Sequence, residues 1–328
     1  MIPRLREHPR ELEVLADRAA EFFRMPATYI EKDFWVTEVL RAASTERQIE
    51  LLDGSSANVT FIFKGGTSLS RIFGIIERFS EDVDLLAIFP GGASSGSRDK
   101  ILRLVDSDVQ AHLGLSDDQV VVSSPTKGVK RYMTYQYPLR EHNSSLKEGV
   151  VLELGSRGGT EPGSVHSMRS LVAEFAINQL DEPSNAWDEF ESFEVNVLAP
   201  ERTLFEKLAA VHDAATRCNR DWLEKHARHY YDISQLLQNE RVLKALRELG
   251  LEGILELVTD IAEHSTSAQF QTTERPADGY AASPAFDIKN EAWSSIEIGY
   301  NAAQSLIYGD QVPLSSVLES VYQARELL

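Results

Sequence analysis

The chain contains 328 residues, of which 51 are acidic and 33 are basic, so its formal net charge at pH 7 is −18. Hydrophobic residues make up 42% of the sequence, which is typical of a soluble folded protein, and the length predicts two domains. Because this excess of negative charge repels phosphate, it excludes a protein that coats nucleic acid non-specifically.

Three further features predict a cytoplasmic protein with no membrane segment. No apolar run approaches the ~18 residues that a membrane-spanning helix requires. The charged start of the chain, residues 1–13, does not resemble a secretory signal. A single cysteine, Cys218, excludes a disulfide scaffold and is typical of a reducing compartment.

The first half of the chain predicts helices and strands in a mixed order. Apolar residues recur at helical spacing over residues 10–50, and the β-branched and aromatic residues at 59–63 predict a buried strand. The elements expected after them are a short helix through residue 75, a strand over 82–89, a helix over 98–114, and strands over 119–123, 130–137, 149–154 and 193–197.

The pattern becomes helical from residue 201 almost to the end of the chain. Pro200 is a suitable first helical residue, because the amide hydrogen that proline lacks has no partner in the first turn. We therefore predict a domain with N-terminal helices over residues 1–198 and a helical domain over residues 199–328, joined in an α+β chain. Residues 265–290, rich in Ser, Thr, Ala, Gly and Pro, predict a long loop.

A pair of carboxylates predicts a divalent metal site. Asp82 and Asp84 alternate along a predicted strand, so they share one face while Val83 and Leu85 face the core. Carboxylates about 6–7 Å apart along a strand are suited to Mg²⁺ or Mn²⁺. Two such ions can activate an attacking hydroxyl and neutralise a leaving pyrophosphate. Seen alone, the pair is more often a solvated strand edge.

A glycine pair precedes these acids and predicts a phosphate-binding loop. Gly65 and Gly66 lie between a predicted strand and a predicted helix, where the absence of Cβ lets the backbone approach a triphosphate. Thr67 and Ser68 add hydroxyl donors. A tight strand-to-helix turn is the more common meaning of a lone glycine pair, but the order of glycines and then acids favours nucleotide binding.

A third acid is expected on a neighbouring strand. Glu153 lies in the apolar stretch 150–154, where a carboxylate is costly to bury unless it is paired or binds a metal. We predict that Glu153 joins Asp82 and Asp84 and helps to position or deprotonate the attacking hydroxyl. A structural ion pair is the alternative.

At these residues the sequence resembles a known family, the AbiEii/AbiGii-type toxin nucleotidyltransferases of type IV abortive-infection toxin–antitoxin systems. The resemblance depends on residues 64–70 (KGGTSLS) and 78–85 (RFSEDVDL). The further matching stretches are residues 30–36 (IEKDFWV), 200–208 (PERTLFEKL) and 228–233 (RHYYDI). His229 occupies a position where that family usually has aspartate, so it is not assigned that aspartate's role.

The resemblance implies a DNA-polymerase-β-like nucleotidyltransferase fold, with a mixed sheet core, N-terminal helices and a helical C-terminal domain. It implies that Lys207 contacts phosphates and that Asp232 orients the lysine or the substrate. Asp82 and Asp84 would bind Mg²⁺. The residues expected to bind the nucleotide are Lys64, Gly65, Gly66, Thr67, Ser68, Ser80 and Lys207.

One basic tract reverses the overall acidity. Residues 127–147 contain five basic side chains and one acidic one, with tyrosines interleaved at 132, 135 and 137. Such a tract combines phosphate contacts with base stacking, so we predict an RNA-binding role for Lys127, Lys130, Arg131 and Arg140. A hairpin with one polar face and one aromatic face is the equal alternative.

Together these features predict a Mg²⁺-dependent nucleotidyltransferase that moves a nucleoside monophosphate from an NTP to an acceptor hydroxyl and releases pyrophosphate. The resemblance implies that the acceptor is an RNA 3′ end, with tRNA favoured, and that an antitoxin is the partner protein. The alternatives are nucleotidylation of a protein hydroxyl, a non-catalytic NTP-binding module, and transfer to a small molecule.

Overall fold

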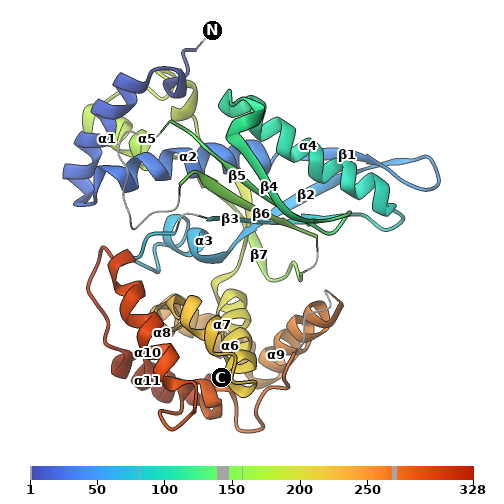
Figure 1. Cartoon of the computed structure of the whole chain (residues 1–328), viewed down its shortest axis with the longest axis vertical. Coiled ribbons are helices and arrows are strands. Elements are labelled where there is room, and N and C mark those ends of the chain that lie inside the picture. Colours follow the sequence, from blue (N-terminus) through green and yellow to red (C-terminus); the bar gives the residue numbers. More distant parts are fainter. Residues whose placement is uncertain (1, 81, 139–147, 157, 268–271) are drawn as a thin grey trace. The chain divides into compact units, whose positions relative to one another are not determined.

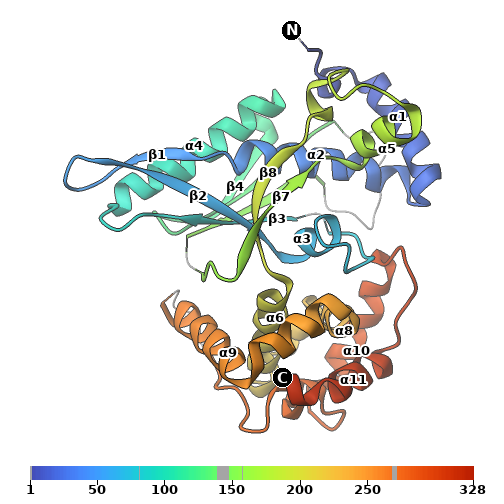
Figure 2. The ribbon, with the colours of Figure 1, turned by 180° about the vertical axis from the view of Figure 1, so that it is seen from behind.

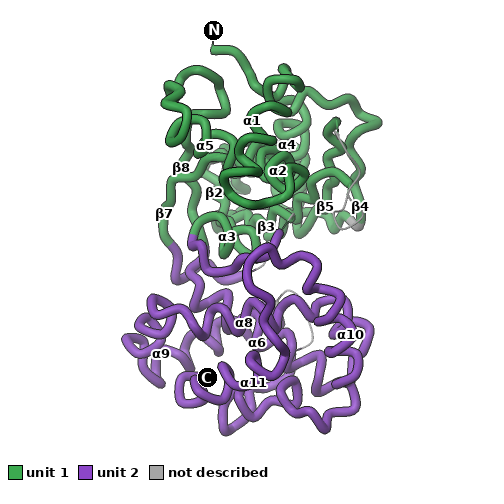
Figure 3. The backbone as a smooth tube through the Cα atoms, turned by 90° about the vertical axis from the view of Figure 1, so that its left-hand side faces the viewer, with its two compact units in different colours: residues 1–72, 80–156, 164–197 green, residues 73–79, 157–163, 198–328 purple. Residues whose placement is uncertain are grey.

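The computed structural model describes residues 2–80, 82–138, 148–156, 158–267 and 272–328. The chain forms two compact units (Figure 3). Unit 1 consists of residues 1–72, 80–156 and 164–197, and unit 2 of residues 73–79, 157–163 and 198–328. Unit 2 thus contains two short segments that come before the last residue of unit 1.

A mixed sheet forms the centre of unit 1 (Figure 1). The strand order is β4-β5-β6-β3-β2-β8-β7, and β1 pairs with β2 outside this path. Strand β3 is antiparallel to β2 and parallel to β6, which makes it a central strand. The strand bounds are β1 Arg47–Glu50, β2 Ser56–Lys64, β3 Asp82–Ile88, β4 Val120–Thr126, β5 Lys130–Tyr135, β6 Val150–Gly155, β7 Gly163–Met168 and β8 Phe193–Leu198.

Helices cover one face of this sheet and provide its core. Helix α2 (Ala27–Ala43) contacts β3 and β6, and α4 (Ser95–Leu113) contacts β1 and β5. The alternate residues of β3 and β6 that face this core are fully buried, as expected for a sheet with one covered face. The other helices of unit 1 are α1 (Pro9–Phe23), α3 (Gly65–Arg71) and α5 (Leu171–Leu180), which Figure 2 shows from behind.

Unit 2 is helical, as predicted for the C-terminal part. Helix α8 (Arg228–Gln238) is its centre, because it packs against α6, α9, α10 and α11. The bounds of the others are α6 Pro200–Thr216, α7 Arg220–Lys225, α9 Glu240–Ser267, α10 Trp293–Ala303 and α11 Leu314–Gln323. Within the described ranges, no helix combines the length and the apolar composition that crossing a membrane requires.

The α+β class is confirmed, but some local predictions were wrong. Helices were expected over residues 10–50, but the second of them ends at Ala43, and residues 47–50 form β1, which pairs with β2. Helix α5 and strand β7 are not among the predicted elements. Helix α5 is apolar on most of its surface and β7 is a largely exposed polar strand, so neither shows the periodicity that a pattern search detects.

Candidate active site

The three predicted acids lie on one face of the unit 1 sheet. In the register of β3 and β6, Asp84 is the direct partner of Glu153, and on the other side Asp84 is the partner of Lys64 in β2. Directly paired residues point to the same face, and Asp82 shares it because it lies two residues before Asp84. Val83 and Leu85 are 0% and 2% exposed on the opposite, core face. The alternation of side chains along β3 therefore places the carboxylates on one face of the sheet and the core residues on the other, as the sequence predicts.

Tyr132 extends this row of polar side chains to β5. It is the direct partner of Glu153 in the antiparallel register, and its hydroxyl donates a hydrogen bond of 2.7 Å to Glu153 Oε1. Burial, this hydrogen bond and the nearby charges of Glu153 and Asp84 raise the pKa of Tyr132, so the phenol remains a donor at neutral pH. The sequence analysis considered Tyr132 only as a stacking residue. Lys130 and Tyr132 are two residues apart on a predicted strand, so the sequence already places them on one face. In the structure the Lys130 ammonium lies 5.3 Å from the centroid of the Tyr132 ring.

Gly65 joins the glycine loop directly to the acidic face. It begins α3 with a φ of +84°, which L side chains rarely adopt. A Cβ atom built on Gly65 would lie 2.0 Å from Asp84 Oδ2. Glycine is therefore required here both by the backbone conformation and by the close approach of the Asp84 carboxylate. The glycine loop and the acid that the sequence predicts to bind a metal are therefore in contact.

Two buried hydroxyls fix the shape of this loop. Thr67 Oγ1 donates a 2.6 Å hydrogen bond to the backbone carbonyl of Asp82, and Ser68 Oγ donates one of 2.9 Å to the carbonyl of Gly65. Both side chains are almost completely buried. The Thr67 bond joins α3 to β3, whereas the Ser68 bond lies within the first turn of α3. Gly66 is also buried, whereas Ser80 is partly exposed.

Gly65→Ala is expected to destabilise unit 1 by about 1–3 kcal/mol, the usual cost of a strained backbone conformation, and to displace the Asp84 carboxylate. Chemical denaturation measures the first effect, and nucleotide transfer measures the second. Gly91→Ala is the matched control, because a Cβ at Gly91 meets nothing within 4 Å. Equal stability and transfer in the two variants would show that the contact between Gly65 and Asp84 is unimportant.

The donor set on the acidic face suits a hard divalent cation. Carboxylate oxygens are the ligands that Mg²⁺ prefers, and Asp82, Asp84 and Glu153 offer them from adjacent strands. The described part of the chain does not gather three His, Cys, Asp or Glu side chains into one metal-binding group, and Glu153 is directed to Tyr132 instead. The fit to the ion therefore rests on the oxygen chemistry of these three residues and not on a preassembled cluster.

Unit 2 brings together Lys207 and Asp232, the two residues that the resemblance singles out. Lys207 Nζ in α6 lies 2.9 Å from Asp232 Oδ2 in α8. The Arg78 guanidinium, which is also in unit 2, donates hydrogen bonds of 2.6 and 2.7 Å to the two oxygens of the same carboxylate. The three side chains are 8%, 0% and 2% exposed, respectively. Sequence analysis gave Arg78 no role, although it lies within a matching motif.

Charge compensation keeps Asp232 ionised in this buried position. Burial by itself would raise the pKa of Asp232, but the charges of Arg78 and Lys207 and the Arg78 hydrogen bonds outweigh it, so the pKa falls well below its usual range. Burial lowers the pKa of Lys207, and the attraction of Asp232 opposes that change. One carboxylate therefore faces two cations.

The basic tract of residues 127–147 divides between two faces of β5. Lys127 is exposed, and Lys130 lies beside Tyr132 on the acidic face. Arg131 points the other way and pairs with Asp106 of α4 at 2.8 Å. Tyr135 donates to the same Asp106, and Tyr137 stacks on Trp35, so both rings are buried in unit 1. Arg140 lies outside the described residues.

The matching motif in α2 has a structural role in unit 1. Asp33 pairs with Arg71 Nε, at the end of α3, at 2.5 Å. It also accepts a 2.7 Å hydrogen bond from the backbone amide of Leu171, the first residue of α5. Asp33 thus connects three helices and supports the helix that follows the glycine loop.

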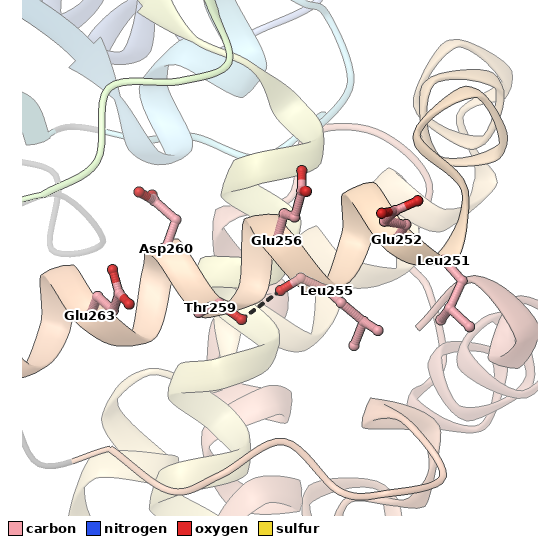
Figure 4. Close-up of a pocket in the computed structure, with 7 residues that line it drawn as sticks. All are labelled: Leu251, Glu252, Leu255, Glu256, Thr259, Asp260 and Glu263. Atoms are coloured by element: carbon pink, nitrogen blue, oxygen red, sulfur yellow. Dashed lines mark hydrogen bonds between the residues drawn. The ribbon is translucent and has the colours of Figure 1, made fainter.

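A shallow hollow on α9 contains none of the predicted site residues. The acids Glu252, Glu256, Asp260 and Glu263 follow one another along this helix (Figure 4). Asp260 also pairs with Arg202 of α6 at 2.6 Å. A lining so rich in carboxylates repels a triphosphate, so the hollow does not compete with the acidic face of unit 1 as a nucleotide site.

Comparison with known proteins identifies a family over most of the chain. Residues 50–288 match a family described as "Nucleotidyl transferase AbiEii toxin, Type IV TA system". The match includes the glycine loop, the acids of β3 and β6, and the cluster of Lys207 and Asp232. A search of curated proteins finds no match. Since the matched region is most of the chain, the protein belongs to the AbiEii family of nucleotidyltransferase toxins from type IV toxin–antitoxin systems.

Proposed function

We propose that the protein transfers a nucleoside monophosphate from an NTP to the 3′ hydroxyl of an RNA, with tRNA the favoured acceptor. The observation that supports this most directly is the contact between the Gly65 backbone and the Asp84 carboxylate. It makes a glycine loop and an acidic strand parts of one surface. That combination serves phosphate and divalent metal chemistry at one place.

The roles of the acids follow from their places in the sheet. Asp82, Asp84 and Glu153 would hold Mg²⁺ or Mn²⁺, which would supply positive charge to the phosphates of the NTP. Glu153 also orients the acceptor hydroxyl and takes its proton. The acceptor oxygen bonds to the α-phosphorus while the bond between the α- and β-phosphates breaks, and pyrophosphate leaves. The Tyr132 hydrogen bond holds the Glu153 carboxylate in place for this task.

Lys207 would supply further positive charge to the triphosphate, with Asp232 orienting its ammonium group. Support comes from the 2.9 Å ion pair and from the burial of both side chains in unit 2. A lysine held by a buried carboxylate has few accessible conformations, so its ammonium group is already in place before a phosphate binds.

RNA is preferred to other acceptors because positive charge lies near Glu153 in a chain whose net charge is −18: Lys130 is on the neighbouring strand β5, and Lys127 is in the turn before it. Membership of a type IV toxin–antitoxin family implies an antitoxin as the partner protein. We propose that this antitoxin relieves the growth arrest caused by transfer to RNA.

The test is incubation of the purified protein with total tRNA, Mg²⁺ and each of the four α-labelled NTPs in turn. We expect label on RNA with at least one nucleotide, equimolar pyrophosphate release, and no label when EDTA replaces Mg²⁺. Label on protein alone would overturn the RNA acceptor in favour of a protein hydroxyl. NTP binding without pyrophosphate release would show a non-catalytic module.

A further inference from the structure

His229 lies beside the ammonium group of Lys207 in unit 2. The residue is in the first turn of α8, three positions before Asp232, so the two side chains share one side of the helix. His229 Nδ1 is 3.3 Å from Lys207 Nζ, while Asp232 Oδ2 is 2.9 Å from the same nitrogen. The ammonium group therefore has two neighbours that come from one helix.

Aromatic packing sets the orientation of the His229 ring. Trp222 of α7 stacks on His226, with ring centroids 4.3 Å apart and an angle of 16°. The His229 ring packs against both, with centroid distances of 5.7 Å to Trp222 and 5.9 Å to His226. His226 directs its own Nδ1 to the Trp222 carbonyl at 2.9 Å. The ring of His229 is thus held with Nδ1 toward Lys207.

The charges around His229 determine whether Lys207 Nζ or His229 Nδ1 is the donor in the hydrogen bond between them. Burial and the positive charges of Lys207, Arg228 and Arg78 lower the pKa of His229 well below its usual value, although Asp232 opposes this. The imidazole is therefore neutral at pH 7, and its Nδ1 accepts a hydrogen bond from the ammonium group. Asp232 and His229 together account for two of the three N–H donors of Lys207.

We propose that His229 is a positioning residue that orients the Lys207 ammonium toward a triphosphate without neutralising its charge. The inference rests on the proposed function. A second carboxylate at this position would cancel the excess positive charge of Arg78 and Lys207 over Asp232, whereas a neutral imidazole keeps it for an anionic ligand.

Three substitutions and a matched control test the proposal. His229→Phe keeps a ring against Trp222 but removes the acceptor, so we expect kcat/KM for the NTP to fall about tenfold, the usual effect of one lost hydrogen bond to a charged group. His229→Asn retains an acceptor and should recover kcat/KM to within about threefold of the native protein. His226→Phe disturbs the same aromatic stack without touching Lys207 and should leave kcat/KM nearly unchanged.

The pH profile separates positioning from a structural role. His229→Asp places a second negative charge beside Lys207, which should raise the lowered pKa of Lys207 by opposing burial and the repulsion of Arg78 and Arg228. The alkaline limb of kcat/KM should therefore move to higher pH. An unchanged limb in His229→Asp, or equal losses in His229→Phe and His226→Phe, would overturn the proposal.

A measurement independent of turnover separates this inference from the proposed function. The ¹⁵Nζ signal of Lys207, assigned with Lys207→Arg, should be sharp in the native protein and in His229→Asn and should broaden in His229→Phe, because the bonded ammonium group exchanges its protons slowly. An identical signal in all variants would disprove the hydrogen bond. If the native protein transferred no label while the signal behaved as expected, only the proposed function would fail.

Discussion

Asp84→Asn is expected to lower nucleotide transfer at least about 10²-fold, and Asp82→Asn to do the same, because each removes a negative charge from the surface where we propose that the metal and the phosphates bind. The side-chain amide has nearly the shape of the carboxylate, so it fits against Gly65 as the native residue does. The free energy of unfolding should therefore change by less than about 1 kcal/mol. Loss of transfer without loss of stability is the expected combination.

Label transfer from an α-labelled NTP measures the first effect, and urea denaturation measures the second. Asp118→Asn is a suitable control, because it removes a carboxylate from an exposed position in the same unit. Titration with Mn²⁺ should give weaker metal dependence in Asp84→Asn than in the control. Native rates in Asp84→Asn at saturating NTP would rule out the acidic face as the reaction site.

Asp232→Ala is expected to destabilise unit 2 by about 3–5 kcal/mol, because it leaves the buried cations Arg78 and Lys207 without their carboxylate. Denaturant unfolding measures the change. Glu248→Ala is the matched control in the same unit, since it breaks an exposed pair with Lys244 at 3.7 Å. That exposed pair should contribute no more than about 1 kcal/mol. Similar values for the two variants would contradict the buried cluster.

The dependence on pH gives the same cluster an independent signature. Because the pKa of Asp232 is lowered in the folded state, the unfolded chain binds the proton first as pH falls. The stabilisation is thus complete above about pH 4, the ordinary range of an aspartate, and decreases as the solution is acidified further. The difference in unfolding free energy between native protein and Asp232→Asn should shrink from pH 6 to pH 3. A constant difference would show that Asp232 is not held ionised by its partners.

Local sequence patterns were sufficient for several parts of this fold. The alternation of Asp82 and Asp84 with apolar neighbours placed the acids on one face, because successive strand residues point in opposite directions. Pro200 marked the first residue of α6, since proline suits a helix start. The acid in the apolar strand at Glu153 led to the residue paired with Asp84. The family assignment, made from short motifs, is confirmed.

Other parts depend on residues that are distant along the chain. Arg78 and Asp232 are 154 positions apart, and no periodicity connects them, so only packing within unit 2 reveals their pairing. The hydrogen bond between Tyr132 and Glu153 depends on the register of β5 and β6. A shift of that register by one residue would turn the two side chains to opposite faces and break the bond. Register likewise turns Arg131 to Asp106 and leaves Lys130 beside Tyr132 on the acidic face.

The sequence by itself therefore determined the fold class and the acidic strand, because these depend on periodicity and turn chemistry within a few residues. It also gave the family, because the motifs that carry the resemblance are short and continuous. The tertiary structure decided what each polar group faces: Gly65 the Asp84 carboxylate, Asp232 two cations, and His229 the Lys207 ammonium. Such pairings arise only when packing and register bring distant segments within hydrogen-bonding distance, where burial makes an unpaired charge costly.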